Sequence, residues 1–297
     1  MKPSKSICTV CILIAGMLWG SMGLFVRSLG QYGLNSLQIA CLRMCVAAVC
    51  FAVLMLCRGK QTFQLRWRDI PLFLGLGLGS VLFFTCCYFF AIQNLSLSVA
   101  AILLYTAPIW VSVASLFIFH ERFTLQKGLA LALSFGGCVL VSGVGGTITP
   151  LGLLAGLGAG IGYGAYSILA GLALRKYKPL TVSGYAFFIA AIGSLVICRP
   201  VQMLRQIAAA PDRGTLILLG VLAGIVTAVL PYLCYTFGLA GISPSAASIL
   251  ATVEPLMATL LGAIVFHERL SLMAALGIVS ILCALILLSL QRKNGTS

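Results

Sequence analysis

The sequence predicts an all-α polytopic membrane protein in which ten transmembrane helices form two inverted five-helix repeats. Its composition, its apolar segments and an internal repeat lead to this prediction. Of 297 residues, 61% are hydrophobic and only 8% are charged, and the mean hydropathy is +1.13. A typical soluble domain has roughly 25% charged residues. The 19 basic and 5 acidic side chains cannot coat a soluble protein of this size, which excludes soluble, disordered and fibrous chains.

Ten apolar segments follow one another along the chain. Each is close to the roughly 20 residues that cross a bilayer core as a helix. Because backbone amides in hydrocarbon must be hydrogen-bonded within their own segment, each is expected to be helical. The segments cover residues 7–26, 36–57, 71–91, 97–119, 127–145, 151–172, 181–198, 214–238, 245–266 and 271–290.

The first segment follows Lys2 and Lys5, as the apolar part of a secretory signal would. However, residues 16–27 contain no convincing small-x-small cleavage site, and nine further apolar segments follow. We therefore expect an uncleaved first helix.

The basic residues predict the orientation, because cytoplasmic loops carry an excess of Lys and Arg. With the N-terminus inside, thirteen basic residues lie on the cytoplasmic side and five outside, although the bias is weak in the second half. We expect a multi-pass protein of the cell membrane with both termini cytoplasmic. The inside set is Lys2, Lys5, Arg58, Lys60, Arg66, Arg68, Arg122, Lys127, Arg175, Lys176, Lys178, Arg292 and Lys293, and the outside set is Arg27, Arg199, Arg205, Arg213 and Arg269.

The net charge of +14 does not indicate a nucleic-acid partner. The basic residues occur in small groups between apolar runs, and no basic surface interleaved with aromatic residues is present. We interpret the charge as a determinant of membrane topology.

An internal repeat is the most informative feature of the sequence. A pattern that includes Tyr88, Pro108 and the triplet at residues 120–122 recurs, without a gap, 147 residues later. The chain is therefore predicted to consist of one unit of five spans used twice, at residues 1–146 and 147–297. Because five is odd, the second unit must be inserted upside down. The matching residues are Cys87, Tyr88, Phe90, Ser96, Ser98, Ala100, Ile102, Leu103, Pro108, Phe119, His120, Glu121 and Arg122 in the first unit, and Cys234, Tyr235, Phe237, Ser243, Ser245, Ala247, Ile249, Leu250, Pro255, Phe266, His267, Glu268 and Arg269 in the second.

Two such units can exchange conformations, so that one arrangement opens inward and the other outward. Inverted repeats of this kind place a substrate site near the bilayer midplane, between the units. The architecture indicates a carrier, although some channels share it.

The sequence resembles EamA-type members of the drug/metabolite transporter superfamily over essentially the whole chain. The resemblance rests on Trp19-Gly20, Leu42-Arg43, Pro108 with Glu121-Arg122, and Glu254-Pro255 with Glu268-Arg269-Leu270. It implies ten helices, two inverted halves and the export or import of small metabolites, often amino acids. One departure is that Met22 follows Trp-Gly-Ser, where many members have Asn, so the polar contacts of the first helix are expected to differ.

Glu254 is the only acidic residue within a predicted span. A charge at mid-bilayer costs roughly 2.5–3.5 kcal/mol, so this carboxylate should face a partner or a wet cavity. It could bind a substrate ammonium group or carry a proton, or it could form a structural ion pair with Arg43. Pro255 is expected to free a backbone carbonyl one turn earlier and to kink the helix. The first unit has Ala107 at the matching position, so the halves differ chemically.

Arg43 is the only base well inside a span. It could hold a substrate carboxylate. We favour a structural role, or a side chain that extends along the helix so that its charged end reaches the lipid headgroups.

Five aromatic residues are candidates to line a cavity for an amphipathic small molecule. Trp19 and Tyr163 take roughly matching places in the two halves, Tyr88 and Tyr235 match in the repeat, and Tyr105 lies with Trp110 on either side of Pro108. Ordinary packing or an interfacial belt is the alternative for each of them.

Several other features are interpreted as structural. Ser98 and Ser245 are expected to cap the fourth and ninth helices. The glycines spaced by four from Gly152 to Gly164 predict a bare face for close helix packing. The two His-Glu-Arg triplets are expected at opposite membrane faces, where they stabilise turns. The twelve cysteines suggest neither a metal site nor a disulfide framework, and no cofactor is expected.

These observations predict a secondary carrier for a small organic metabolite, with export favoured. A proton gradient acting through Glu254 or the substrate gradient alone would drive it. The alternative is a passive channel, for which the sequence offers no ring of charges and no filter-like loop. An intramembrane enzyme is disfavoured because no nucleophile–base or metal set lies within the spans. The expected partners are the small-molecule substrate, the lipid bilayer and protons.

Overall fold

The computed structural model describes residues 4–143, 148–267 and 271–294, and these ranges contain helices and connecting loops but no strand. Among them, nine helical stretches are long and apolar enough to cross a membrane, and the shorter apolar helix Leu272–Leu288 matches the tenth predicted segment. The all-helical fold class is thus confirmed. Lys2, Glu268, Arg269 and Leu270 lie outside the described residues.

The first half contains five spans in order. They are α1 (Lys5–Gly20) with α2 (Met22–Gly30); α3 (Ser36–Arg58); α4 (Ile70–Leu74), η3 (Gly75–Leu82) and α5 (Phe83–Asn94) as one span; α6 (Leu97–Leu104) with α7 (Ala107–Ile118); and α8 (Leu125–Ser142). Two short 3-10 turns, η1 (Lys60–Phe63) and η2 (Trp67–Asp69), connect the second span to the third.

The second half repeats this order. Its spans are α9 (Pro150–Ala173); α10 (Pro179–Ile197); α12 (Arg213–Gly224), η4 (Ile225–Val229) and α13 (Leu230–Leu239) as one span; α14 (Pro244–Leu250) with α15 (Val253–Val265); and α16 (Leu272–Asn294). The helix α11 (Pro200–Ala209) between the second and third spans was not predicted, because it is too short to register as an apolar segment.

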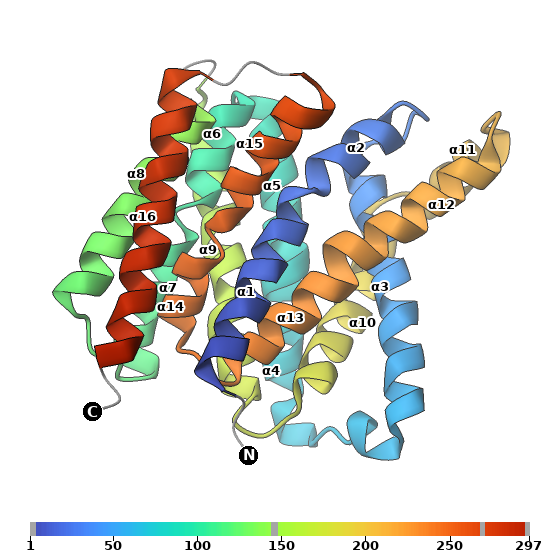
Figure 1. Cartoon of the computed structure of the whole chain (residues 1–297). Helices are drawn as coiled ribbons and strands as arrows, with labels where there is room; N and C mark the ends of the chain where they lie inside the picture. Colours follow the sequence, from blue (N-terminus) through green and yellow to red (C-terminus); the bar gives the residue numbers. More distant parts are fainter. Residues whose placement is uncertain (1–3, 144–147, 268–270, 295–297) are drawn as a thin grey trace.

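The same irregularities occur at matching places in the two halves. The third span of each half contains a π-helical segment, η3 or η4, and these overlap when the sequences are aligned at the repeat offset. The fourth span of each half breaks near its middle, between α6 and α7 and between α14 and α15. In Figure 1, α6 lies above α7 whereas α14 lies below α15, so the two copies run in opposite directions. Both chain ends lie at the lower side of this view.

The first helix of each half packs against the opposite half. Helix α1 contacts α13 and α15, and α9 contacts α5, α6 and α7. The predicted glycine stripe makes the second of these contacts possible. A Cβ atom on Gly160 would lie 2.6 Å from the carbonyl oxygen of Leu103, and one on Gly164 would lie 3.2 Å from that of Ala107. The packing role predicted for the stripe is therefore confirmed.

The predicted helix caps are wrong by two residues. Ser96 and Ser243, rather than Ser98 and Ser245, are the N-cap residues of α6 and α14. The Ser96 side chain accepts a hydrogen bond from the Val99 amide. Ser245 lies inside α14, where its hydroxyl is free to form a contact with the other half of the protein.

That contact is with Glu121, in the turn between α7 and α8. The Glu121 carboxylate accepts hydrogen bonds from the Ser245 hydroxyl and, at 2.9 Å, from the Lys127 ammonium group. The preceding residue, His120, has a φ of 51°, and His267 has a matching φ of 55°. Glu121, the middle residue of the first His-Glu-Arg triplet, thus joins the α7–α8 turn to α14. This contact agrees with the structural role predicted for the triplet.

This cluster predicts a pH-dependent contribution to stability. Burial alone raises the pKa of Glu121, but the hydrogen bonds from Ser245 and Lys127 outweigh it and lower the pKa. The cluster therefore stabilises the folded state above the unfolded pKa of about 4.3, and this contribution is lost as the pH falls through the lower folded pKa. Glu121→Gln should cost about 1.5–3 kcal/mol at pH 7 and less at pH 4, measured by thermal unfolding in detergent. The exposed neighbour Arg122 provides the control Arg122→Gln, and equal losses at both pH values would contradict the assignment.

Adjacent glycines in α8 provide a second test of the fold, since α8 packs along α16. A Cβ atom on Gly137 would lie 2.8 Å from the Gly277 carbonyl oxygen, whereas one on Gly136 would meet nothing within 4 Å. Gly137→Ala should destabilise the protein by about 1–3 kcal/mol through overpacking, and Gly136→Ala should be neutral or slightly stabilising. Thermal unfolding of both variants tests the α8–α16 interface. Equal unfolding temperatures for the two variants would show that this interface is misassigned.

Candidate functional site

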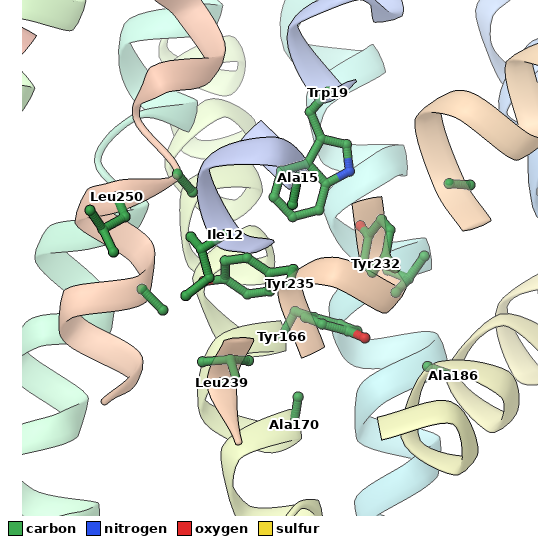
Figure 2. Close-up of a cluster of buried hydrophobic side chains, with 14 of the residues drawn as sticks. Ile12, Ala15, Trp19, Tyr166, Ala170, Ala186, Tyr232, Tyr235, Leu239 and Leu250 are labelled. Atoms are coloured by element: carbon green, nitrogen blue, oxygen red, sulfur yellow. The ribbon is translucent and has the colours of Figure 1, made fainter. Parts of the chain in front are cut away.

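Aromatic side chains from both halves meet at the centre of the molecule. The Trp19 ring of α1 lies 5.9 Å from that of Tyr163 in α9, 5.2 Å from Tyr232 and 5.3 Å from Tyr235, both in α13. Figure 2 shows Trp19, Tyr166, Tyr232 and Tyr235 gathered around one point. This convergence follows from the crossing of α1 and α9 into the opposite halves, and we call these five residues the aromatic centre.

The aromatic centre surrounds a cavity of about 20 Å³, which is lined by its five residues together with Pro108 and Ser248. A space of this size holds about one water molecule. The centre is therefore closed in this conformation, and a metabolite would require the surrounding helices to separate.

Hydroxyl groups satisfy one another around this cavity. The hydroxyls of Ser167 and Tyr235 lie 2.7 Å apart, and those of Tyr166 and Thr236 lie 2.8 Å apart. Because these groups are buried, the bonds offset the cost of removing them from water. The network also joins α9 to α13.

Sequence reasoning found Trp19, Tyr163 and Tyr235 but missed Tyr166 and Tyr232. A signal for Tyr166 was present, because the repeat offset aligns it with Trp19. No comparable signal marked Tyr232, whose position depends on how α13 packs against α10 and α1.

Glu254 lies beside the aromatic centre, at the break in the ninth span. It is the second residue of α15, and its Oε2 accepts a hydrogen bond of 2.8 Å from the Tyr163 hydroxyl. A carboxylate in the first turn of a helix is also stabilised by the helix dipole. Tyr88 and Tyr105 do not line the central cavity. The Tyr88 ring lies beside Phe84, whose ring is 5.3 Å from that of Tyr163. The structure thus brings Glu254 together with Tyr163 and the cavity, but it leaves Tyr88 and Tyr105 outside the cavity lining.

Pro108 and Pro255 both lie in the first turn of the half-helix that follows a break. The carbonyl expected to be freed by Pro255 belongs to Ala251, and it accepts a hydrogen bond of 3.0 Å from the Glu254 amide. The prediction of a free acceptor is therefore wrong. The chain instead interrupts the helix before the proline, so that the carbonyl finds another donor.

Arg43 is bound to the eighth span. Its Nε donates to the Thr227 hydroxyl at 2.6 Å, and one terminal nitrogen donates to the Thr227 carbonyl at 2.9 Å. Thr227 lies within η4, where the π-helical hydrogen-bond pattern changes the carbonyl positions. Arg43 and Glu254 attract each other only at longer range, so the direct ion pair considered from the sequence is wrong and the structural role of Arg43 is supported.

Among the described residues, no group of three or more His, Cys, Asp and Glu side chains is arranged to hold a metal ion. The chemistry available at the centre is one carboxylate, several phenolic hydroxyls and aromatic faces. These groups can bind a cation or a hydrogen-bonding solute with an apolar part.

Comparison with known proteins agrees with the fold and the repeat. The EamA-like transporter family matches the chain twice, over residues 6–143 and 150–290. A solved crystal structure with 20% identity superposes with a TM-score of 0.81 over 99% of this chain and 100% of the other, which supports the fold.

Curated relatives extend over most of the chain. An uncharacterized transporter of Archaeoglobus fulgidus is 28% identical over 93% of this chain and 94% of its own length. The uncharacterized transporter YwfM of Bacillus subtilis is 26% identical over 98% of this chain and 97% of its own. Protein PecM of Dickeya dadantii is 33% identical over 71% of each chain.

The forked contact of Arg43 with Thr227 leads to a specific prediction. Lysine cannot reproduce the two divergent donors of a guanidinium group. Arg43→Lys should lower the free energy of unfolding by about 1–3 kcal/mol, whereas Arg205→Lys, at an exposed position of α11, should have no effect. Thermal unfolding in detergent measures both, and an unchanged unfolding temperature for Arg43→Lys would show that the contact is dispensable.

Proposed function

Because the chain belongs to the EamA-like transporter family, we propose that it is a secondary transporter that exports small organic metabolites, such as amino acids, by alternating access. The transporter class, the multi-pass membrane location and a small-molecule substrate follow from the family. The substrate, the direction and the mechanism are the content of the proposal.

The observation that supports alternating access best is the closed aromatic centre between two inverted copies of one unit. The proposed units are residues 1–146 and 147–297. The first helix of each unit packs against the other unit, and these two helices carry Trp19 and Tyr163. Separation of the helices on one side of the centre opens it to that side, and the inverted copy allows the equivalent movement on the other. A passive channel fits less well, because a cavity of about 20 Å³ leaves no continuous path for a metabolite.

Glu254 determines which chemical groups the proposed transport site can bind. Its carboxylate can bind the ammonium group of an amino acid, while the surrounding aromatic faces accept the apolar part. When no substrate is bound, the same carboxylate can take up a proton, which couples transport to a pH gradient. Ala107 holds the matching position in the first half, so the proposed coupling uses only the second half.

The proposed location is the cell membrane, with both termini in the cytoplasm. The distribution of basic residues supports this orientation, and Figure 1 places both chain ends on the same side. In export, the substrate would then enter the transport site from the cytoplasmic side, where both termini lie.

Counterflow in proteoliposomes tests the proposal. Labelled amino acids should accumulate against unlabelled substrate, and a pH step should change the rate. Glu254→Gln should abolish the response to pH, because the amide cannot carry a proton, and exchange should persist at a reduced rate. Asp212→Asn is the matched control, because this exposed acidic residue caps α12 outside the centre and asparagine caps a helix equally well.

A pH response retained by Glu254→Gln would reject its role as proton carrier. Currents above the turnover of a carrier would instead identify a channel. The direction is tested separately by metabolite efflux from cells that overproduce the chain.

A further inference from the structure

A second, larger cavity lies away from the aromatic centre. It has a volume of about 650 Å³ and opens between the C-terminal end of α3, η1, the start of α10, and the facing sides of α1 and α13. We call it the rim cavity. Its volume is in the range of small-molecule sites.

The lining of the rim cavity is divided by depth. Arg58, the last residue of α3, and Lys178, the N-cap of α10, lie where these helices end. Leu54 lies one turn further into α3 and Leu233 lies further into α13, whereas Phe237 is near the C-terminal end of α13. A phospholipid has the same order, because its charged headgroup lies at the interface and its acyl chains lie in the hydrocarbon.

The two cations have no protein partner among the described residues. The nearby carboxylate of Asp69 is already bound to Lys176 and to the Tyr177 hydroxyl, each at 2.7 Å. Arg58 and Lys178 are exposed. Their charges are therefore available to an anion, and the start of α10 adds a helix dipole of favourable sign.

Buried contacts join the helix ends that carry the two cations. The Thr181 hydroxyl in α10 donates to the Thr62 carbonyl at 3.0 Å, and the Thr62 hydroxyl donates to the carbonyls of Met55 and Gly59. These bonds connect the end of α3 to the start of α10 through η1. Arg58 and Lys178 are thereby held on one rim.

The apolar part of the cavity is open to the side. Leu54 and Phe237 are each 37% exposed, although both lie in membrane-spanning helices. An acyl chain can therefore enter the cavity from the bilayer. A soluble anion would not need this lateral opening.

We propose that the rim cavity is a binding site for an anionic phospholipid, with the headgroup phosphate held by Arg58 and Lys178 and an acyl chain between α3 and α13. Basic pockets between transmembrane helices are suited to such headgroups. This site is separate from the proposed transport site, so either proposal can fail without the other.

Titration of the purified full chain in detergent, followed by native mass spectrometry, tests the site. Phosphatidylglycerol should bind more tightly than phosphatidylcholine with the same acyl chains. The double variant Arg58→Gln/Lys178→Gln should bind phosphatidylglycerol roughly thirtyfold more weakly, which corresponds to about 1 kcal/mol for each basic residue. The control Arg66→Gln/Arg68→Gln removes two exposed charges outside the cavity and should bind as the unaltered protein does.

A second variant tests the apolar part of the site. Leu54→Trp keeps both cations but narrows the lateral opening, so it should weaken phosphatidylglycerol binding and leave the unfolding temperature without lipid unchanged. Equal binding of the two lipids, wild-type binding by the double variant, or equal losses in the control would each overturn the proposal. Inorganic phosphate that competes as strongly as phosphatidylglycerol would assign the site to a soluble anion instead.

Discussion

The structure depends on the close approach of α1 and α9 to the helices of the opposite half. In hydrocarbon, helices gain little from burying apolar surface, so association depends on packing and on hydrogen bonds between helices. The bare face of α9, with Gly160 against the Leu103 carbonyl, permits that approach. It places Tyr163 beside Trp19 and within hydrogen-bond distance of Glu254. Without this crossing, the aromatic residues of the two halves would not share one centre.

The breaks in the fourth and ninth spans are the second constraint. An interrupted helix leaves backbone groups without their usual partners, which lipid does not tolerate. Both breaks are followed within the first turn by a proline, and both lie inside the protein beside the aromatic centre. The only acidic side chain within a predicted span, Glu254, follows one of them. An irregular backbone, a helix N-terminus and a carboxylate thus coincide near the middle of the molecule, an arrangement that carriers with inverted repeats use at their binding sites.

Much of this arrangement could be predicted from the sequence, because lipid imposes strict rules. Segment length and hydropathy indicated the spans, and the repeat indicated the inversion. Glu254 was identifiable because it is the only acidic residue within a span. The partner of Arg43 was not identifiable, since Thr227 lies 184 positions away in a π-helical segment. Tyr232 was missed for a similar reason, because its place in the centre depends on helix packing. The caps of α6 and α14 were misplaced because two serines at each start fit the same pattern.

The proposed alternating access requires that Glu254 is exposed in turn to the two sides of the membrane. The most direct measurement is its modification by a membrane-impermeant, water-soluble carbodiimide in right-side-out and in inverted vesicles, followed by peptide mass spectrometry. The account predicts that Glu254 is modified in both preparations, because each arrangement of the halves opens the centre to one side. Modification from a single side, or from neither, would contradict alternating access at this centre.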